Sequence, residues 1–503
     1  MDSIAKKRVL IFIVAYNAER KIEKVIERIP RSLAQYDTRI LIIDDSSKDQ
    51  TFELARRFEG APFPMTVLFN PVNQGYGGNQ KIGFHYAAKE GFDFVALLHG
   101  DGQYAPECLP ELLQPLVNGE ADAVFGSRMM GRTGALKGGM PLYKYAGNRI
   151  LTAIQNRLLG TSLSEFHSGY RLYSVKALQA VPFDRNTNNF HFDTEIIIQL
   201  VRGNFRIKEL PIPTYYGDEI CHVNGIRYAW DVIQATLLSR AQDLGVLYDL
   251  KYDVRRPGQA NPLYQAKWGF TSPHTLTLDR VAGGSRVLDV GCASGYMARA
   301  LSDRGCDVTG IDMYPPPPGS GLTRFIQADL SNTDLPLDAG DYQYILLLDV
   351  IEHLVSPEGF VDALRRSRKR GDETRVIVST GNVAFVVTRL MLLLGYFHYG
   401  ARGILDMTHT RLFTFATLRD LFQQGGYRIE EVRGIPAPFP LAFGEGALAR
   451  FLVAVNRFLI RLSRGFFSYQ IFMVVRPLPT VDWLLQAAKD TAAEKAATVP
   501  PRA

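Results

Sequence analysis

Cysteine is scarce in this 503-residue chain and its few copies are scattered. The four cysteines, Cys108, Cys221, Cys292 and Cys306, include no pair with C-x-x-C spacing. The sequence therefore indicates neither a zinc site nor a disulfide framework. Scattered thiols are typical of the reducing cytosol, and we expect a cytoplasmic protein.

Long apolar runs are also missing. The chain begins basic and then apolar, but the apolar run is short and leads into Tyr16-Asn17 rather than into the small residues of a cleavage site, so we expect a first strand and no signal peptide. The stretch nearest in length to a membrane span, 386–399, is interrupted by Arg389 and His398. It also falls short of the roughly 20 residues that a spanning helix needs.

The chain has no long run of lysine and arginine, although its net charge is +6. This pattern does not indicate a nucleic-acid partner, and it is compatible with an anionic ligand or a membrane surface. The remaining composition, 46% hydrophobic and 21% charged, is that of an ordinary globular protein. The length suits two or three domains.

In the first half, short apolar runs alternate with helical periodicity. We expect strands at Val9–Val14, Ile40–Ile43, Thr66–Phe69 and Phe94–Leu98, and helices at Arg20–Ile29, Phe52–Phe58 and Lys81–Lys89. We expect the glycine-rich tract between the last two of these helices, which contains Gly75–Gly78, to be a loop. This alternation predicts a doubly wound α/β domain with a parallel sheet, whose strand ends form the ligand site.

The polar cluster after the strand Phe94–Leu98 is the most informative one. It reads His99-Gly100-Asp101-Gly102-Gln103, and carboxylate and amide oxygens suit a hard divalent cation that bridges a diphosphate. The alternative is a plain strand-to-helix turn in which Asp101 caps the helix. Asp44 and Asp45, which follow another strand, have the same capping alternative.

Taken together, these tracts resemble a known family. V-A-Y-N-A-E, I-D-D-S-S-K-D-Q-T, N-Q-G-Y-G-G-N, H-G-D-G-Q-Y and G-S-R resemble the family-2 glycosyltransferases of GT-A fold, most closely the dolichol-phosphate-mannose-synthase-like branch. S-E-F-H-S-G-Y-R at 164–171 and E-L-P-I-P at 209–213 strengthen the resemblance, which covers about Arg8 to Tyr216. It implies a nucleotide-sugar donor and transfer with inversion.

The resemblance also implies roles for individual residues. The metal, Mg²⁺ or Mn²⁺, would be bound by the catalytic Asp101 and by Gln103. Planar guanidinium groups would contact phosphate oxygens, with a surface ion pair as the alternative for each. The nucleoside would be held by Tyr16, Asn17, Glu19 and Asp45, and the phosphates by Arg128 and Arg171, with Asp44 also at the nucleotide-sugar site.

One position departs from the family pattern. The family often has D-x-D where this chain has His99-Gly100-Asp101. Imidazole is a softer ligand than carboxylate and suits Mg²⁺ poorly, so His99 is left as a donor contact or a structural residue.

The acceptor determines whether the first domain needs a general base. A lipid phosphate is already an anion, whereas a hydroxyl acceptor needs a carboxylate within hydrogen-bond reach. Glu165, Asp193 and Glu195 are the candidate bases, and the pair Asp193–Glu195 could simply cap a helix. We expect a polyprenyl phosphate or related glycoconjugate, with a sugar hydroxyl as the open alternative.

The helical pattern Tyr228–Leu250 and a polar break near Pro257 place a domain boundary. We expect a first domain at 1–252, a second at 253–478 and a flexible tail at 479–503. The helix could lie on a membrane surface, but packing between domains is the expected arrangement.

The second half begins a new α/β unit with V-L-D-V-G-C-A-S-G-Y at 287–296, a strand followed by a glycine turn. Met297–Asp303 is an expected helix and Asp307–Ile311 an expected strand. Asp312 lies 21 residues after Gly291, about the spacing at which an acidic residue meets a ribose diol. This spacing alone leaves open a nucleotide such as NAD.

Two further tracts narrow the alternatives. Ala328-Asp329-Leu330, at the end of an expected third strand, and L-L-L-D-V-I-E-H-L at 346–354 resemble class I S-adenosylmethionine-dependent methyltransferases of Rossmann-like fold. The resemblance covers about residues 261–476. It implies that the methionine part of the cofactor is framed by Asp289, Gly291 and Gly295, the ribose bound by Asp312, the adenine bordered by Asp329 and Leu330, and the pocket lined by Asp349.

His353 is the expected catalytic base of the second domain. D-V-I-E-H resembles the segment of small-molecule O-methyltransferases whose histidine takes a hydroxyl proton, and histidine titrates near neutrality. Packing of the site wall is its alternative. His409 is a second candidate base or substrate contact. We expect O-methylation of the glycan or its acceptor, and a scaffold protein with one inactive half is the competing class.

Two apolar segments of the second domain have two interpretations each. Asn382–Thr410, an insertion after the strand Val376–Ser379, could be a substrate lid or a membrane-touching segment. Leu448–Leu462 is apolar on one side and is accompanied by Arg450, Arg457, Arg461 and Arg464. It could lie on the inner face of a membrane as a peripheral contact, but we expect it to pack on the core with solvated arginines.

Overall fold

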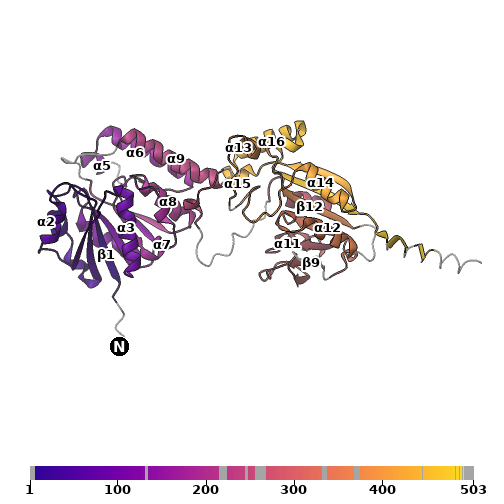
Figure 1. Cartoon of the computed structure of the whole chain (residues 1–503), viewed down its shortest axis with the longest axis horizontal. Helices are drawn as coiled ribbons and strands as arrows, with labels where there is room; N and C mark the ends of the chain where they lie inside the picture. Colours follow the sequence, from indigo (N-terminus) through magenta and orange to yellow (C-terminus); the bar gives the residue numbers. More distant parts are fainter. Residues whose placement is uncertain are drawn as a thin grey trace, which may run out of the picture. The chain divides into compact units, whose positions relative to one another are not determined.

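The computed structural model describes residues 6–130, 134–214, 224–243, 247–254, 268–330, 337–367, 374–400, 402–444, 446–481, 483–485, 488, 489 and 491. The chain divides into two compact units, Met1–Gln242 with Tyr248–Gln259, and Asp243–Leu247 with Ala260–Ala503 (Figure 1). Each unit contains its own seven-stranded sheet. The predicted pair of α/β domains is confirmed.

The first unit is built on a sheet with the strand order β3-β2-β1-β4-β6-β5-β7. The strands are β1 (Arg8–Ala15), β2 (Asp37–Asp44), β3 (Met65–Phe69), β4 (Phe94–His99), β5 (Ala123–Ser127), β6 (Arg171–Ser174) and β7 (Ile207–Pro211). The helices are α1 (Ile22–Glu27), α2 (Thr51–Arg57), α3 (Gly75–Lys89), α4 (Leu109–Val117), α5 (Gly134–Lys137), α6 (Leu142–Leu159), α7 (Val175–Gln179), α8 (Phe192–Arg202) and α9 (Gly225–Asp243).

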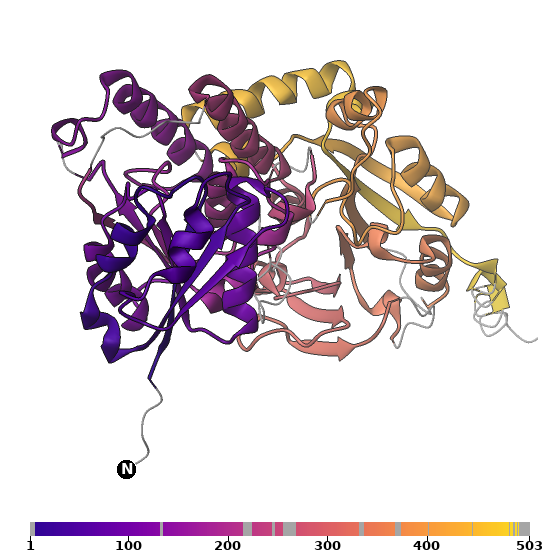
Figure 2. The same ribbon diagram turned by 60° about the vertical axis from the view of Figure 1, so that its left-hand side comes forward.

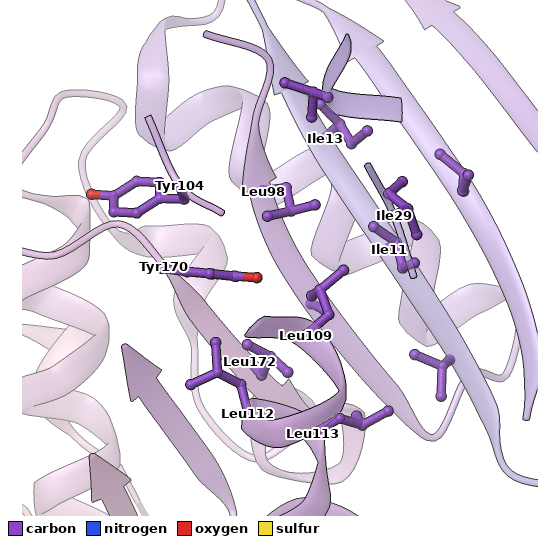
Figure 3. Packing of buried hydrophobic residues seen from close by; sticks show 14 of the residues in the cluster. Ile11, Ile13, Ile29, Leu98, Tyr104, Leu109, Leu112, Leu113, Tyr170 and Leu172 are labelled. Atoms are coloured by element: carbon purple, nitrogen blue, oxygen red, sulfur yellow. The ribbon is translucent and has the colours of Figure 1, made fainter. Parts of the chain in front are cut away.

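Alternating side chains of these strands build two hydrophobic cores, one on each face of the sheet. In β1, Ile11 and Ile13 pack with residues of α1 and α4, and Figure 3 shows this core. Leu10 and Phe12 point to the other face, where residues of α3, α7 and α8 cover them. The period of two along the strand thus produces the double winding that the sequence predicts.

The sheet is mixed rather than wholly parallel, which corrects one expectation. β6 runs antiparallel to both β4 and β5, while β3, β2, β1 and β4 are parallel neighbours and β5 pairs in parallel with β7. An apolar run in a sequence carries no direction, so the expected alternation of strands and helices could not reveal this reversal.

The glycine-rich tract expected to be a loop is instead the start of α3. The backbone N–H groups of Gln74 and Gly75 donate to the Asp45 carboxylate at 2.8 and 2.9 Å, so the helix begins on this anion. A Cβ at Gly77 would lie 2.5 Å from the carbonyl oxygen of Thr187. Glycine is therefore needed for close packing, not for a turn.

The linking helix is shorter than expected. α9 is described through Asp243 and residues 244–246 lie outside the described residues, but residues 247–249 are not helical, whereas the sequence pattern predicted a helix through Leu250. The Gln242 side chain accepts a hydrogen bond from the backbone N–H of Asp249 at 2.9 Å, and a short 3-10 helix follows at Leu250–Tyr252. Tyr252 is fully buried in the first unit, so the chain folds back onto that unit after α9.

The second unit has the strand order β10-β9-β8-β11-β12-β14-β13, with β14 antiparallel to both of its neighbours. Its strands are β8 (Arg286–Val290), β9 (Asp307–Asp312), β10 (Arg324–Gln327), β11 (Tyr344–Leu348), β12 (Arg375–Gly381), β13 (Tyr427–Ile435) and β14 (Gln470–Pro477). Its helices are α10 (Pro273–Arg280), α11 (Tyr296–Ser302), α12 (Pro357–Arg366), α13 (Val386–Leu393), α14 (Phe415–Gln424), α15 (Phe439–Phe443), α16 (Ala447–Leu462) and α17 (Arg464–Phe467).

This sheet is also covered on both faces. Residues of α12 and α14 pack on one face and residues of α10 and α11 on the other. The third strand, β10, ends at Gln327, three residues before the expected end at Leu330. Asp329 and Leu330 follow it, outside the sheet.

The helix α16 corrects another expectation, that it packs its apolar side on the core. Its buried residues are Ala449, Val453 and Asn456. The larger apolar side chains form an exposed row along the helix, which we call the α16 stripe: Leu448, Phe451, Val455, Phe458 and Leu462. Figure 1 shows α13 beside α16, and the turned view in Figure 2 keeps these helices close together.

The neighbouring helix α13 exposes apolar side chains as well. The exposed residues at its carboxyl end are Leu390, Leu392, Leu393 and Leu394. The Arg389 guanidinium lies 5.5 Å from the ring centroid of Phe466 in α17, which joins this segment to the end of α16. Within the described residues, no helix is both long enough and apolar enough to cross a bilayer.

Candidate active sites of the two units

The carboxyl ends of three parallel strands meet at one edge of the first sheet. Ala15 of β1 is paired with Asp44 of β2, and Val14 is paired with His99 of β4. The residues after these pairs therefore leave the sheet side by side. This edge brings together most of the predicted donor-site residues: Tyr16, Asn17, Glu19, Asp44, Asp45, Asp101 and Gln103.

The loop after β1 is fastened to the loop after β2. The Asn17 backbone N–H donates to the Ser47 hydroxyl at 2.8 Å, and the Asn17 side-chain oxygen accepts from the Lys48 N–H at 3.0 Å. Glu19 accepts from the Gln50 N–H at 3.1 Å. Tyr16 is exposed, with 46% of its surface accessible.

Asp44 and Asp45 have different surroundings although both are buried. The Asp45 carboxylate accepts from the Asn70 side chain and from two backbone N–H groups at the start of α3. Asp44 accepts from the Ser47 N–H through Oδ1, while its Oδ2 has no hydrogen-bond partner among the described residues. Burial raises the pKa of Asp44. Asp45 thus holds the loop and the start of α3, while Asp44 is enclosed beneath this loop.

Asp101 is exposed at the end of β4 and the side chain of Gln103 lies two residues further on. The Gln103 N–H donates to Asp101 Oδ1 at 2.9 Å, which fixes the turn. A carboxylate and an amide oxygen on one turn, open to solvent, fit a hard divalent cation whose other ligands are phosphate oxygens and water. The donor set therefore fits Mg²⁺ or Mn²⁺.

His99 is held by aromatic side chains. Its Nε2 lies 3.3 Å from the Tyr76 hydroxyl, and its ring packs edge-on against Tyr104 with centroids 4.9 Å apart. A Cβ at Gly169 would lie 2.7 Å from its Cε1. Burial lowers the pKa of His99, so the ring is neutral near pH 7. These contacts support the structural alternative for His99.

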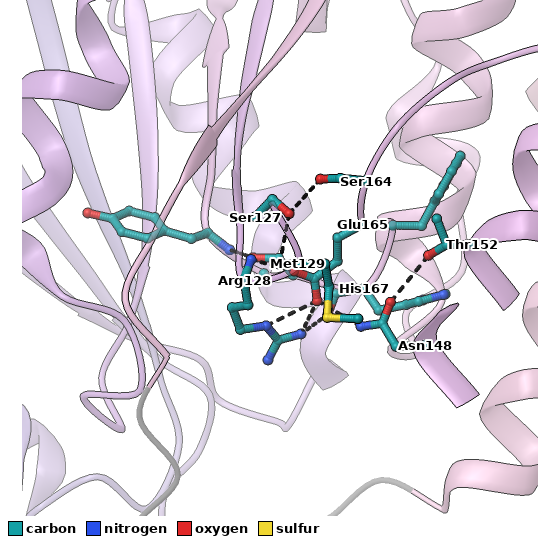
Figure 4. Close-up of polar contacts among 12 residues, drawn as sticks. Ser127, Arg128, Met129, Asn148, Thr152, Ser164, Glu165 and His167 are labelled. Carbon is teal, nitrogen blue, oxygen red and sulfur yellow. Dashed lines mark hydrogen bonds and ion pairs between the residues drawn. The ribbon is translucent and has the colours of Figure 1, made fainter. Parts of the chain in front are cut away.

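Arg128 forms a buried ion pair rather than a surface one (Figure 4). Its Nε and backbone N–H donate to the Glu165 carboxylate at 3.0 and 2.7 Å, and Nη2 donates to the His167 carbonyl at 3.0 Å. Asn148 of α6 donates to the same carboxylate at 2.8 Å. Burial raises the pKa of Glu165, but the attraction and hydrogen bonds of Arg128 outweigh it and the net pKa is lowered.

Arg171, at the start of β6, is 1% exposed and donates to three backbone carbonyls. The acceptors are the carbonyl oxygens of Phe166, Ser168 and Asp193, each at 2.7 Å. Its guanidinium also lies 3.7 Å from the Asp193 carboxylate. With these groups around it, Arg171 is positioned to hold the 166–168 loop and the start of α8, and we propose this role in place of the phosphate contact expected from the sequence.

The three candidate bases are all engaged with other groups. Glu165 pairs with Arg128 as described above. The Asp193 carboxylate accepts from Tyr76 at 3.0 Å and Gln80 at 3.3 Å. Glu195 accepts from the Thr187 N–H at 2.6 Å and from the Lys251 ammonium at 2.8 Å.

Glu209 and Tyr76 are site residues that the sequence did not single out. Glu209 on β7 accepts from the Ser164 N–H and hydroxyl at 2.6 and 2.8 Å and from the Glu165 N–H at 3.0 Å. It therefore joins the two tracts S-E-F-H-S-G-Y-R and E-L-P-I-P. In the sequence, only the presence of both tracts could have indicated this contact. Tyr76 lay in the tract expected to be a loop.

In the second unit, the glycine turn after β8 forms the wall of a second site. Gly291 and Gly295 have φ of 72° and 75°, in the region that favours glycine. A Cβ would lie 2.6 Å from the Val350 side chain at Gly291 and 2.5 Å from the Ser320 carbonyl at Gly295. Asp289 at the end of β8 is buried, and burial together with the nearby Asp312 raises its pKa to about 7.

Asp312 connects the ends of two neighbouring strands. Its carboxylate accepts from the Ala293 N–H at 2.9 Å and from the Tyr314 N–H at 3.1 Å. It is only partly buried, so it faces both the glycine turn and solvent. Asp329, which is exposed, and the half-buried Leu330 follow β10, the strand next to Asp312.

Asp349 follows β11 with φ of 55°, a strained value for a non-glycine residue. Its carboxylate accepts from the Ser379 hydroxyl at 2.7 Å and from the Gln470 amide at 2.9 Å. Ser379 and Gln470 were not among the predicted site residues; they lie on β12 and β14. The strain and the two partners fix Asp349 at the carboxyl edge of the second sheet.

His353 and His409 meet beside this edge. His353 ends a short 3-10 helix (Ile351–His353), and the two imidazole rings pack edge-on with centroids 4.8 Å apart. Glu352 next to them is 2% exposed, and burial together with Asp349 raises its pKa to about 8. The two candidate histidines of the sequence are therefore brought together with a carboxyl group that was not predicted.

Comparison with known proteins assigns both units. Residues 10–181 match the family described as Glycosyl transferase family 2, and residues 270–432 match a methyltransferase domain. These matches confirm the fusion that the sequence motifs indicate.

Three relatives match the first unit. A UDP-N-acetylglucosamine–dolichyl-phosphate N-acetylglucosaminyltransferase of Methanococcus voltae is 28% identical over 227 residues, which cover 43% of this chain and 88% of the relative. An undecaprenyl-phosphate mannosyltransferase of Micrococcus luteus is 28% identical over 208 residues, 41% of this chain and 82% of the relative. A low-salt glycan biosynthesis hexosyltransferase of Haloferax volcanii is 32% identical over 222 residues, 43% of this chain and 50% of the relative.

Proposed function

Because the chain joins a glycosyl transferase family 2 domain to a methyltransferase domain, we propose a bifunctional enzyme of glycoconjugate synthesis. The first unit transfers a sugar from a nucleotide-sugar donor to a polyprenyl phosphate, with inversion. The second unit transfers a methyl group from S-adenosylmethionine to an oxygen of the glycan or of its acceptor.

The proposed phosphate acceptor rests on one observation: the carboxylates of all three candidate bases are already bonded to other groups. Glu165, Asp193 and Glu195 accept hydrogen bonds or ion pairs from neighbouring side chains and backbone groups. A hydroxyl acceptor needs a carboxylate that can take its proton, whereas a phosphate attacks as an anion. Two of the relatives are named for transfer to dolichyl phosphate and undecaprenyl phosphate, which supports the same choice.

Asp101 and Gln103 are the residues proposed to act on the nucleotide-sugar donor. These two residues would hold Mg²⁺ or Mn²⁺, and the bound cation would neutralise the departing diphosphate. Tyr16, which is exposed, would pack on the nucleobase, and Asp44 and Asp45 would shape the nucleoside end of the site. Arg128 and Arg171 would act indirectly, by holding the 165–168 loop that forms the wall of the site.

Transfer to polyprenyl phosphate tests this proposal directly. The full chain, Mn²⁺ and a panel of UDP-, GDP- and dTDP-sugars with a labelled sugar are incubated with a short-chain polyprenyl phosphate. We expect the label to enter the lipid phase with one donor class. Labelling of a free sugar but not of the lipid phosphate would contradict the proposed acceptor and support a sugar hydroxyl.

The methyltransferase unit gives a separate prediction. Asp312→Ala removes the carboxylate that holds the glycine turn and is expected to bind the ribose hydroxyls. Loss of hydrogen bonds to a charged group costs about 1.5–3 kcal/mol, so the Kd for S-adenosylmethionine should rise by about 10–100-fold in calorimetry. Asp303→Ala, an exposed aspartate of the same unit, is the control and should leave this Kd unchanged.

A shared substrate would explain why the two units form one chain. We propose that the lipid-linked product of the first unit, or its acceptor, is the methyl acceptor. Labelled S-adenosylmethionine supplied together with an active donor should then label the lipid product. Methylation that occurs only without this product would contradict the shared substrate.

We also propose that the α16 stripe and the exposed leucines of α13 contact an anionic membrane surface. The stripe lies on the side of α16 away from its buried Ala449, Val453 and Asn456, so apolar side chains face outward. Exposed arginines accompany it: Arg450, Arg457 and Arg461. An amphipathic helix with basic flanks binds an anionic bilayer, where a polyprenyl phosphate would also be found.

Vesicle flotation of the full chain tests this contact. The variant with both Phe451→Asp and Phe458→Asp removes two large apolar groups from the stripe, each worth about 1.5–3 kcal/mol when buried. We expect at least about a tenfold loss of binding to vesicles that contain anionic lipid. Leu484→Asp with Leu485→Asp, also exposed, is the matched control. Equal losses in both variants would contradict a specific role of α16.

A further inference from the structure

The cluster of Glu352, His353 and His409 has the features of a metal site. One carboxylate oxygen and one nitrogen from each imidazole lie within 4.8 Å of one another. Across the described ranges of the chain, this is the one group of three or more such side chains that converges in this way. Its members come from two segments, the 3-10 helix after β11 and the loop before α14.

The imidazole orientations are fixed by backbone carbonyls. His353 Nδ1 lies 3.2 Å from the Thr408 carbonyl oxygen, and His409 Nδ1 lies 3.0 Å from the Ile404 carbonyl oxygen. A carbonyl only accepts, so both Nδ1 atoms carry the proton and both Nε2 atoms keep a lone pair. Metal-binding histidines are oriented by the same second contact.

Glu352 supplies an independent sign of a missing partner. Its side chain is 2% exposed and its Oε2 makes no hydrogen bond of ordinary length among the described residues, although the Thr380 hydroxyl and the Gly381 N–H lie near enough to offset part of the pKa rise that burial causes. A buried carboxylate oxygen without a partner is unfavourable, and a cation beside it would satisfy it. The unpartnered oxygen belongs to the same side chain that converges with the two imidazoles.

The two segments are also tied to each other by the backbone. The Glu352 carbonyl accepts from the N–H groups of Thr410 at 2.9 Å and Arg411 at 3.1 Å. The Thr410 hydroxyl donates to the Leu354 carbonyl at 2.6 Å. The cluster is therefore built on fixed backbone, as a preformed ligand site requires.

We propose that Glu352, His353 and His409 bind a divalent cation of borderline softness, with Zn²⁺ as the best fit, at the methyl-acceptor site. Two imidazoles and one carboxylate are a zinc ligand set that leaves a position for a substrate oxygen, and imidazole disfavours Mg²⁺. This inference rests on the proposed O-methylation. The two histidines would act on the acceptor hydroxyl through the cation and not as direct proton acceptors.

In this arrangement, each proton, bond and electron pair of the methyl transfer is accounted for. The acceptor hydroxyl bound at the open position loses its proton to water, which the cation favours by stabilising the oxyanion. The oxygen then forms a bond to the methyl carbon, while the sulfur–methyl bond breaks and its electron pair stays on sulfur. The products are the methyl ether and S-adenosylhomocysteine.

The test measures Zn²⁺ binding in the full chain carrying Asp101→Ala, which removes the proposed metal ligand of the first unit. Dialysis against Zn²⁺ and competition with a chromogenic chelator give stoichiometry and affinity. We expect one bound equivalent in this parent, and at least about a tenfold weaker affinity after His409→Ala or Glu352→Gln. His398→Ala, an exposed histidine of the same unit, is the matched control and should keep the affinity.

Binding of S-adenosylmethionine in each variant shows whether the second unit is folded. A parent that binds no Zn²⁺, or variants with parental affinity, would overturn the site. Loss of methylation in His353→Ala with Zn²⁺ still bound would also overturn it, in favour of a direct base. Failure of the proposed methyltransferase would instead be seen as absent cofactor binding, and Zn²⁺ lost with His409→Ala would still support the site.

Discussion

Replacement of Asp101 by asparagine should lower the rate of sugar transfer by about 10²–10³-fold, because the departing diphosphate loses the cation that neutralises its charge. Asparagine keeps Oδ1, which accepts from the Gln103 N–H, so the turn should be preserved. Asp101 is exposed, and the thermal stability of the chain should therefore be unchanged. Transfer to polyprenyl phosphate at several Mn²⁺ concentrations measures the effect.

Glu107→Gln is the matched control for this change. Glu107 lies six residues further along the chain and forms an exposed ion pair with Arg28 at 2.8 Å, so it carries the same charge change outside the strand end. Exposed pairs contribute little, and this variant should keep its activity. If Asp101→Asn retains transfer within a factor of about three, the charge on this carboxylate does not hold the cation and the assignment of the donor site fails.

The second large effect is expected for Arg171→Ala, and it concerns stability. The substitution removes the donor to three buried carbonyl oxygens and the positive charge 3.7 Å from the Asp193 carboxylate, which keeps its hydrogen bonds from Tyr76 and Gln80. Breaking a buried pair by removing one partner costs about 3–5 kcal/mol, a large part of the stability of an ordinary domain. Chemical denaturation of the full chain, with S-adenosylmethionine binding as the report on the second unit, should show early unfolding of the first unit alone.

Arg206→Ala is the control for Arg171. Its guanidinium is exposed and pairs with Asp122 at the surface of the same unit, so the unfolding midpoint should not move measurably. Wild-type stability of Arg171→Ala combined with weaker donor binding would show that this arginine reaches the phosphates, as the sequence first suggested. The stability measurement thus separates the two roles.

The elements of both sheets could be predicted because they depend on local pattern. The run Val9–Val14 is apolar and β-branched, and it forms β1 almost to the residue. The motif residues after it also fall where expected, at the carboxyl edge of the sheet. Strand direction is different, since nothing in the β6 segment states which neighbour it will meet, and the antiparallel insertion could not be foreseen.

The roles of individual polar residues were harder to predict, because one residue type serves two purposes. An arginine in a family motif can contact phosphate, or it can be buried and donate to backbone carbonyls. Only the three carbonyls around Arg171 distinguish these two roles. Asp44 and Asp45 are neighbours with the same side chain, yet one is fully engaged and the other keeps an unpartnered oxygen. Such differences arise from contacts far apart in the sequence.

The apolar helix α16 shows a related limit. Its amphipathic pattern is the same whether the apolar side faces a core or a bilayer, and packing is the commoner outcome. The described structure buries Ala449, Val453 and Asn456 and leaves the α16 stripe exposed. The periodicity thus predicted the helix correctly, but it could not show which side of the helix would be buried.

Among the described residues, the large hydrophobic clusters are each built within one unit. A substitution that disrupts the core of one unit should therefore leave the activity of the other unit intact. In a cell that carries two copies of the gene, one damaged in the glycosyl transferase half and one in the methyltransferase half, both reactions should persist. Joining the two domains in one chain then ensures that they are made in equal amounts. Neither domain needs the other in order to fold.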